Sequence, residues 1–451
     1  MSYMLAVTDP KSNGFGGGGA MLVSDPSGDE VLSYDYYTSS GYEESNYDIG
    51  IPGLVKGLET VYEDFGKLPF EDLINPAIEM AENGFTITPM YASHLQYYPY
   101  LVELNPAFNH NGSLPQNGST LVQKELAAVL RGIRDMGSDY VYGGISSFSK
   151  ELMLVSGLSE KSLMNYTVNI KPAVQTNYGN GMIYSAPSPF SGASTIQMIK
   201  MADQLNIKGF ETAQDFINYD KIMSLVYREN YRLIGDSGNL GDESQIVSDE
   251  YISDMLQRET SAIDFDMNES ASTMSFSVID KNGMTVTATH TLSNLYGSLN
   301  VVQGVFLNNS LTNFSKSSVN TYQPMKRPKT FVSGIIIIEG KDIKAIGSAG
   351  GQDIPQVLLQ DVINTQHQDK TLQESLDTGR FTWNSGTFRL EISDETNQYS
   401  NSLSSAGLPQ VKLTSSGIVG ISPSVGVKDG IYEAATDYRG SYNEASYAKN
   451  E

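Results

Sequence analysis

Two threonines, Thr273 and Thr291, stand near the two ends of a predicted β-hairpin. Phe276 and its neighbours are strand formers, and Asn282-Gly283 is typical of a tight turn that tolerates positive φ. The return strand alternates, with threonines at 285, 287, 289 and 291 on one face and mostly apolar residues on the other. Folding about the turn places Thr291 opposite Thr273 to within about one residue. Taken alone, the stretch favours a surface hairpin with a threonine ladder.

A threonine hydroxyl acts as a nucleophile without histidine when it begins a chain, because its own α-amino group then serves as the base. Thr273 would qualify if the Ser272–Thr273 bond were cut. The same chemistry needs backbone N–H donors for the oxyanion, and Gly350-Gly351, at the start of a predicted helix, would supply them. A simple strand-to-helix turn is the alternative interpretation of these two glycines.

Other chemistries find little support in the sequence. There is no cysteine and no G-x-S-x-G motif, and the four histidines are scattered without zinc-binding spacing. His290 falls on the apolar face of the return strand and is predicted to be a core histidine. The run Gly14 to Gly19 formally matches a dinucleotide fingerprint, but a strand and not a helix follows it. We therefore expect a close backbone crossing there, and no cofactor or metal.

Composition limits the class of protein. The chain has 451 residues, a hydrophobic share of 39% and a net charge of −23, so we expect a packed globular protein that binds neither nucleic acid nor anionic membrane. No apolar run approaches the roughly 20 residues of a membrane span, so no membrane insertion is expected. The first residues do not resemble a signal peptide.

Periodicity predicts helices over 54–65, 70–83, 121–135, 194–205, 213–233 and 354–366, and strands mainly in the last third. Met4 to Val7 is predicted to be a short strand. The acidic stretch from Asp242 to Ser272 is predicted to be a connector with one helical patch. The whole pattern favours a layered α/β domain with helices packed on stacked sheets.

Several segments together resemble the γ-glutamyltransferase (γ-glutamyltranspeptidase) family of N-terminal-nucleophile hydrolases. They cover nearly the whole chain in the family's order: 14–23, 50–58, 62–70, 75–85, 187–192, 273–277, 306–314, 326–328, 347–351 and 437–439. The resemblance implies a four-layer αββα sandwich. It also implies a precursor that cuts itself into segments 1–272 and 273–451, which stay intertwined in one domain.

By the same resemblance, Thr273 is the nucleophile for self-cleavage and catalysis, and it forms a γ-glutamyl acyl-enzyme that water or an amine resolves. Thr291 matches the threonine that hydrogen-bonds the nucleophile, and Gly350 and Gly351 match the oxyanion pair. Substrate-binding positions fall on a set of four residues: Ser293, Asn313, Thr330 and Arg439.

The chain also departs from the family pattern. The arginine that holds the substrate α-carboxylate is missing from the segment 33–39, Asn313 replaces an acidic residue, and Ser293 replaces an asparagine. Thr330-Phe331 replaces a serine pair, and Met274 replaces the second threonine. Because a lost arginine removes a bidentate clamp, free glutathione is a less natural substrate than an internal unit of poly-γ-glutamate, whose carboxylate Arg439 would bind.

Three functions therefore stay open: a γ-glutamyl hydrolase or transferase acting on a small compound, peptide or polymer; a non-catalytic binding or structural protein; and an amidase for another acyl group. By resemblance the protein is bacterial, is related to glutathione metabolism, and is secreted, periplasmic or on the cell surface. A cytoplasmic location also stays open.

Overall fold

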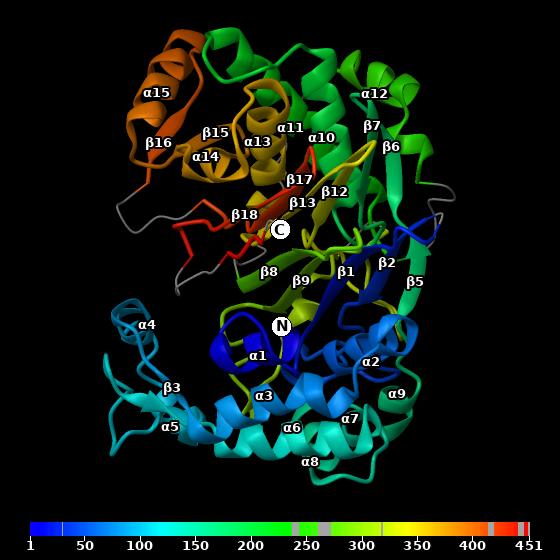
Figure 1. Cartoon of the computed structure of the whole chain (residues 1–451), viewed down its shortest axis with the longest axis vertical. Helices are drawn as coiled ribbons and strands as arrows, with labels where there is room; N and C mark the ends of the chain where they lie inside the picture. The colour runs from blue at the N-terminus through cyan, green and yellow to red at the C-terminus, as the bar shows by residue number, and fades with distance from the viewer. Residues whose placement is uncertain are drawn as a thin grey trace.

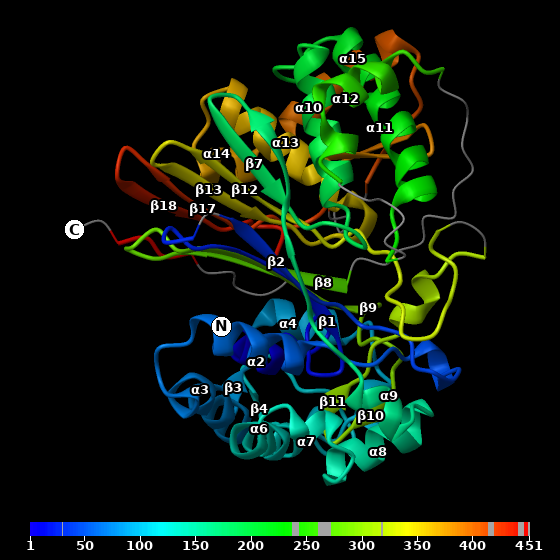
Figure 2. The same ribbon diagram turned by 90° about the vertical axis from the view of Figure 1, so that its right-hand side faces the viewer.

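Two large antiparallel sheets lie face to face, and a layer of helices covers the outer side of each (Figures 1 and 2). This computed structural model describes residues 1–28, 30–236, 243–259, 272–316, 319–413, 419–440 and 446–449. The order of layers is helix, sheet, sheet, helix, which confirms the predicted αββα sandwich.

The first sheet has the strand order β5-β2-β1-β9-β8, so the predicted hairpin forms one of its edges. Its strands are β1 (Gly18–Ser24), β2 (Val31–Tyr36), β5 (Asn169–Pro172), β8 (Ser272–Ile279) and β9 (Thr285–Ser293). The central strand β1 pairs with β2 on one side and β9 on the other. Strands that lie far apart in the sequence, such as β1 and β9, thus pair in this sheet.

The second sheet has the strand order β18-β17-β13-β12-β7-β6. Its strands are β6 (Val174–Tyr178), β7 (Gly181–Ser185), β12 (Gly334–Glu339), β13 (Asp342–Gly347), β17 (Ser424–Lys428) and β18 (Ile431–Ala435). The four isoleucines of β12 explain its central place, because Ile335, Ile336 and Ile337 are buried on both faces.

The first helical layer packs on the outer face of the first sheet. It contains α1 (Ser2–Thr8), α2 (Leu54–Phe65), α3 (Phe70–Asn83), α6 (Lys124–Met136), α7 (Asp139–Tyr142), α8 (Ser147–Ser156) and α9 (Glu160–Met164). Gly57 of α2 lets the helix approach β2, since an added Cβ would lie 2.2 Å from the Tyr36 ring.

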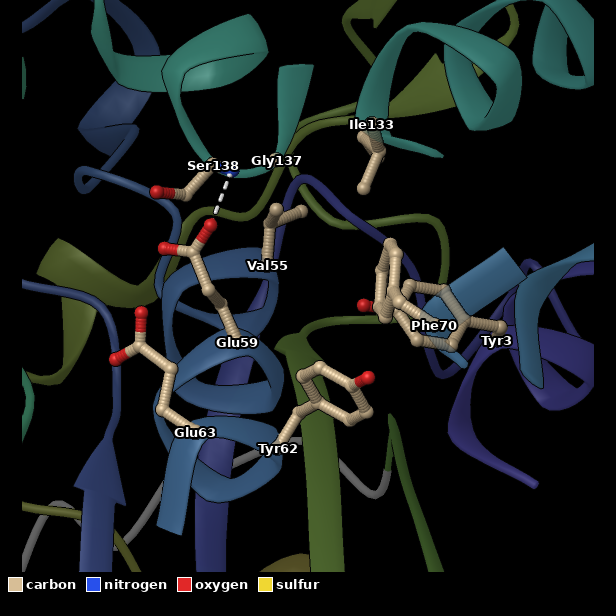
Figure 3. Close-up of a pocket in the computed structure, with 9 residues that line it drawn as sticks. All are labelled: Tyr3, Val55, Glu59, Tyr62, Glu63, Phe70, Ile133, Gly137 and Ser138. Atoms are coloured by element: carbon tan, nitrogen blue, oxygen red, sulfur yellow. Dashed lines mark hydrogen bonds between the residues drawn. The ribbon is translucent and has the colours of Figure 1, made fainter. Parts of the chain in front are cut away.

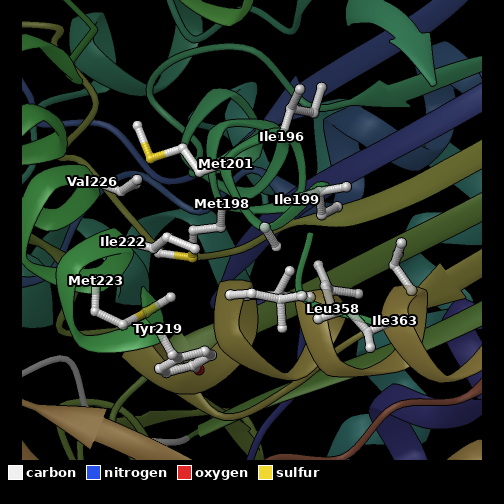
Figure 4. Packing of buried hydrophobic residues seen from close by; sticks show 14 of the residues in the cluster. Ile196, Met198, Ile199, Met201, Tyr219, Ile222, Met223, Val226, Leu358 and Ile363 are labelled. Atoms are coloured by element: carbon white, nitrogen blue, oxygen red, sulfur yellow. The ribbon is translucent and has the colours of Figure 1, made fainter. Parts of the chain in front are cut away.

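The second helical layer covers the second sheet and contains α10 (Gly192–Gln204), α11 (Ala213–Leu233), α12 (Asp249–Leu256), α13 (Ile354–His367), α14 (Leu372–Asp377) and α15 (Asp394–Ala406). Its largest cluster of apolar side chains joins α10, α11 and α13 (Figure 4). Met198, Ile222 and Leu358 are fully buried in it. A side sheet of β14 (Phe381–Asn384), β15 (Thr387–Leu390) and β16 (Gln410–Lys412) borders this layer.

A small lobe extends beside the first helical layer. It contains β3 (Phe85–Thr86), α4 (Pro89–Leu95), α5 (Leu101–Leu104) and β4 (Thr120–Leu121). The ribbon of β10 (Val301–Val302) and β11 (Val305–Phe306) lies beside α8 (Figure 2). The aromatic core of the lobe includes Tyr91, Phe108 and Tyr296. Tyr296 connects the lobe to the end of the hairpin.

Periodicity located most elements correctly, and α2, α3 and α11 have the predicted bounds. The predicted strand over Met4–Val7 is wrong, because these residues belong to α1. Its buried apolar residues are Tyr3, Ala6 and Val7, a helical spacing that a four-residue apolar run could not reveal. The helical patch in the predicted connector is α12, while Asp242 and residues 260–271 of that connector lie outside the described residues.

Candidate active site

Thr273 and Thr291 lie directly opposite each other in the β8–β9 ladder, as the turn predicted. The residues of the turn itself account for its geometry. Gly283 has a φ of +90°, and the side chain of Asp280 accepts hydrogen bonds from the N–H groups of Asn282 and Met284. Because a turn of fixed length sets the register, this part of the site follows from the sequence.

The ladder is irregular at the bond that precedes Thr273. Ser272 pairs with Ser293 and Thr273 pairs with Thr291, so a register shift falls between Ser272 and Thr273. The Thr291 hydroxyl donates a hydrogen bond of 2.5 Å to the carbonyl oxygen of Ser272. It also accepts one of 2.9 Å from the Ser293 N–H. Thr291 therefore polarises the carbonyl that adjoins the Thr273 nitrogen.

Ser272 has a second anchor. Its hydroxyl donates a 2.9 Å hydrogen bond to the carbonyl oxygen of Lys11, which also accepts the Tyr296 N–H at 2.7 Å. Ser272 is fully buried. Sequence reasoning missed this contact because Lys11 lies 261 positions away and shares no pattern with the hairpin.

The threonine face of the hairpin is buried, so the expectation of a surface ladder is wrong. Thr285, Thr287, Thr289 and Thr291 are at most 3% exposed. Their face points at the second sheet: the Thr289 hydroxyl reaches the Ser333 carbonyl, and Thr287 lies against Gly334. A sandwich buries both faces of an inner strand, which periodicity within one strand cannot indicate.

Gly350 and Gly351 connect β13 to α13 in a sharp turn. Their φ angles are +148° and +60°, a backbone that side chains rarely tolerate. The preceding strand end lies over β8, since a Cβ on Gly347 would be 2.1 Å from the Ser275 hydroxyl oxygen. Ser275 is two residues beyond Thr273 on the same face, so the glycine turn follows a strand that meets β8 near Thr273.

Asp353 follows this turn and is buried. Burial raises the pKa of its carboxyl to about 6, although Arg389 and a hydrogen bond from Thr382 act in the opposite direction. The Arg389 guanidinium lies 3.9 Å from the carboxylate. A titratable group thus sits beside the proposed oxyanion turn, and the sequence pattern did not single it out.

Three predicted substrate-binding residues have different local settings: Asn313 ends a short 3-10 helix, and Thr330 lies outside the helices and strands. Ser293 ends β9 with a φ of +75°. The Asn313 side chain donates a 3.2 Å hydrogen bond to the Tyr37 hydroxyl. Thr330 is 1% exposed, and its hydroxyl accepts the Val332 N–H at 3.2 Å. Their roles stay predictions.

Arg439 is enclosed by protein groups, which weighs against its predicted role as a ligand for a substrate carboxylate. Its guanidinium forms two bonds of 2.6 Å with Glu391 and one of 3.1 Å with Asp437. The carbonyl oxygens of Leu376 and Thr378 accept the remaining donors. Since these bonds use all five N–H donors of a guanidinium, a substrate would have to displace one of them.

The segment that lacks the family's arginine holds a buried acid instead. Asp35 of β2 forms an ion pair of 3.1 Å with Arg327, and both side chains are about 5% exposed. Arg327 also donates to the Thr167 carbonyl and lies over the Tyr166 ring. The Arg327 side chain is therefore held by contacts within the folded protein.

His290 is a core residue, as predicted. It is 1% exposed, and its Nε2 lies 2.9 Å from the Tyr36 hydroxyl. Burial lowers its pKa to about 3, so the ring is neutral at working pH. Within the described residues, no group of three or more His, Asp or Glu side chains is arranged to hold a metal, and no helix is long and apolar enough to span a membrane.

A pocket of about 240 Å³ lies away from the hairpin, between α1, α2, α3 and α6 (Figure 3). Its lining includes Tyr3, Glu59, Tyr62 and Phe70, and the Ser138 N–H donates to Glu59. None of the predicted site residues lines it. The pocket is therefore separate from the candidate site at Thr273.

Comparisons with known proteins agree on one family. A sequence model described as Gamma-glutamyltranspeptidase matches residues 1–447. The "Capsule biosynthesis protein CapD proenzyme" of Bacillus anthracis is 33% identical over 428 residues, which cover 93% of this chain and 80% of that protein. The "Glutathione hydrolase proenzyme" of Bacillus subtilis (strain 168) is 26% identical over 453 residues, with 87% and 77% coverage.

Solved structures share the fold. The cephalosporin acylase from Bacillus halodurans aligns with a TM-score of 0.85 at 19% identity, covering 100% of this chain and 90% of that one. The same four-layer architecture therefore occurs in a protein of low sequence identity.

Proposed function

Since the chain belongs to the γ-glutamyltranspeptidase family, we propose that it is a self-cleaving γ-glutamyl amide hydrolase or transferase whose nucleophile is Thr273. The family supports the broad class of N-terminal-nucleophile, self-processing enzymes. The named residues, the cut between segments 1–272 and 273–451, and the substrate are our proposal.

The observation that carries the proposal is the hydrogen bond from the Thr291 hydroxyl to the Ser272 carbonyl. In self-cleavage, the Thr273 hydroxyl oxygen attacks that carbonyl carbon, and the Ser272–Thr273 C–N bond breaks as an ester forms. The hydroxyl proton passes to the leaving nitrogen, which becomes the free α-amine of Thr273. Water then hydrolyses the ester, which gives a Ser272 carboxylate and restores the Thr273 hydroxyl. Thr291 stabilises the negative charge on the carbonyl oxygen.

In turnover, the freed α-amine acts as the general base for the Thr273 hydroxyl. The hydroxyl attacks the γ-carbonyl of the donor, and the N–H groups of Gly350 and Gly351 stabilise the oxyanion. The amine of the donor leaves with a proton, and a γ-glutamyl ester remains on Thr273. Water releases glutamate from this ester, whereas an amino acceptor forms a new amide.

A denaturing gel and mass spectrometry test self-cleavage. We expect wild type to give fragments of 272 residues and of the remaining 179. Thr273→Ala removes the nucleophile and should leave one intact chain. The conservative Thr273→Ser keeps a hydroxyl and should still be cut. A wild-type chain that stays intact after prolonged incubation would contradict the proposal.

The surroundings of Asn313 favour a donor whose α-nitrogen is uncharged. The carboxamide contacts the Tyr37 hydroxyl, and Asp35, two residues before Tyr37 in the sequence, is already paired with Arg327. A neutral amide suits the acylated nitrogen of an internal γ-glutamyl unit better than the ammonium of free glutathione. The protein named for capsule biosynthesis is also more similar to this chain than the glutathione hydrolase is. We therefore propose a γ-glutamyl peptide or poly-γ-glutamate as donor.

Two anilide donors separate these substrates. N-acetyl-γ-glutamyl anilide carries a neutral α-nitrogen and should give a higher kcat/KM than free γ-glutamyl anilide. Asn313→Asp introduces a carboxylate and should reverse the order by about tenfold or more, the effect of a charge-assisted hydrogen bond. Equal rates for both donors in wild type would refute this assignment of the donor.

The same panel addresses the other functions. Self-cleavage without turnover of any donor would indicate a binding protein, and turnover confined to non-glutamyl amides would indicate another amidase. We propose an extracellular or cell-surface location from the family resemblance, and fractionation of the producing cells tests it.

A further inference from the structure

A buried network of charged side chains lies behind the Gly350-Gly351 turn. Asp437 accepts a 2.6 Å hydrogen bond from Arg380 and a 3.1 Å bond from Arg439. Arg439 in turn binds Glu391 through two bonds of 2.6 Å. These four side chains are at most 9% exposed. Because every charge has an opposite partner, the network is rigid and costly to distort.

The network holds the segment Val419–Ser422 at several points. Asp437 accepts the Ser422 N–H at 3.0 Å, and Glu391 accepts the Val419 N–H at 3.4 Å. Arg380 donates to the Gly420 carbonyl at 3.4 Å. The segment therefore takes its position from buried charges and not from a regular sheet.

The segment Val419–Ser422 in turn holds the residues that lead into the glycine turn. Ile421 and Ala349 exchange two backbone hydrogen bonds of 2.7 and 2.8 Å. The Ser422 hydroxyl donates a 2.9 Å bond to the Gly347 carbonyl. Gly350 itself packs on Gly420, since a Cβ on Gly350 would lie 2.9 Å from the Gly420 Cα.

We propose that Asp437, through Ser422, is a positioning residue for the N–H groups of Gly350 and Gly351. The chain of contacts runs from Asp437 to Ser422, from Ser422 to Gly347, and so to the turn three residues later. The inference rests on the proposed function, because it assigns these N–H groups to the oxyanion. The inference also assigns a role to Arg439, which would hold Asp437 in position and would not contact the substrate.

The position of these donors matters because oxyanion stabilisation is strongly geometric. A donor that shifts by a fraction of an ångström from the oxyanion loses much of its effect on the transition state, while substrate binding changes little. Loss of positioning should therefore lower kcat and leave KM nearly unchanged.

Ser422→Ala is the gentlest test, because it removes one hydroxyl and leaves the buried charges intact. We expect kcat for a γ-glutamyl anilide to fall about tenfold with KM unchanged, since the lost hydrogen bond affects the transition state. Ser424→Ala is the matched control: Ser424 is also buried, two residues along, and its hydroxyl donates to the Ser422 carbonyl and not to Gly347. It should keep wild-type kcat.

Asp437→Asn should give a larger fall in kcat, about 100-fold, by removing the charge that holds both arginines. Since this variant can fail to fold, hydrogen–deuterium exchange is measured on Ser422→Ala as well. The peptide covering Gly347 to Asp353 should exchange faster than in wild type and in Ser424→Ala. Circular dichroism and thermal unfolding confirm that each variant is folded.

The two readouts separate the two proposals. An inactive wild type whose Ser422→Ala variant still shows faster exchange refutes the proposed function and supports the positioning of the turn. An active wild type whose Ser422→Ala variant keeps both kcat and exchange overturns the positioning role. A Ser422→Ala variant in which KM rises as kcat falls, as expected of a partly unfolded protein, also overturns it.

Discussion

At the scale of single residues, the site is built from hydroxyls and backbone groups. The Thr291 hydroxyl donates to the Ser272 carbonyl oxygen, and the Ser272 hydroxyl donates to the Lys11 carbonyl oxygen. The Ser272–Thr273 bond is therefore fixed on its acyl side at two points. Such fixation would hold the Ser272 carbonyl in place for the attack that we propose for the Thr273 hydroxyl.

Replacing Ser272 tests the second anchor. Ser272→Ala should slow self-cleavage about fivefold, the effect of one hydrogen bond, and Ser272→Thr should restore the rate. The Lys11 carbonyl keeps its bond from Tyr296, so the variant leaves no unsatisfied acceptor. The rate is followed by the loss of intact chain on gels. Ser277→Ala, which removes a hydroxyl farther along β8, is the control, and an equal rate for both variants would contradict the prediction.

Asp353 predicts a pH dependence of stability. Its folded pKa of about 6 lies above the ordinary value of 3.8, so the folded chain binds the proton more tightly than the unfolded chain. This contribution to folding is fully present below about pH 4 and is lost as the pH rises through about 6. Asp353→Asn should therefore be more stable than wild type at pH 7, by on the order of 2 kcal/mol, and similar at pH 4.

Denaturant unfolding at both pH values measures this difference. The exposed Asp254 provides the control, because Asp254→Asn removes the same charge from a surface position. A gain at pH 7 that is no larger for Asp353→Asn than for Asp254→Asn would count against the prediction.

At the scale of elements, the glycine run allows β1 to lie between its neighbours. A Cβ on Gly19 would lie 2.2 Å from the Thr289 carbonyl oxygen, and one on Gly17 would lie 2.3 Å from the Thr291 carbonyl oxygen. The predicted close crossing of backbones is thus confirmed. The run positions β9, and through β9 it positions Thr291.

Gly19→Ala should therefore destabilise the protein by about 3 kcal/mol, because the paired backbone of β9 cannot move away from the new methyl group. Gly14→Ala in the same run meets no atom within 4 Å and should have little effect. The free energy of unfolding of the two variants, measured in urea, decides between them. Equal stability would show that β9 yields to the methyl group.

At the scale of the whole molecule, the two proposed segments are interleaved. The first sheet takes β1, β2 and β5 from residues 1–272 and most of the β8–β9 hairpin from the remainder. The second sheet takes β6 and β7 from the first segment and four strands from the second. Each segment thus completes sheets of the other, and the division itself stays a prediction.

We expect the two fragments to remain together after self-cleavage. On a native gel-filtration column they should elute as one species near 49.2 kDa, and they should separate only in denaturant. Separate elution of the fragments in native buffer would contradict the interleaved arrangement.

The sequence by itself determined the features whose physical cause is local. The Asn282-Gly283 turn and the alternation of β9 set Thr273 opposite Thr291, and helical periodicity set α2, α3 and α11. The glycine run also predicted the close approach of β1 to its neighbours, because only glycine fits where backbones nearly touch.

Only the tertiary structure decided which partner each polar group has. The type of residue showed that Arg439 carries a charge, but its partners Glu391 and Asp437 became visible only when the chain was folded. The same holds for the burial of the threonine face and for Lys11 beside Ser272. Local propensity acts over a few residues, whereas burial and pairing depend on segments that lie farther apart in the sequence, 48 residues for Arg439 and Glu391 and 261 for Ser272 and Lys11.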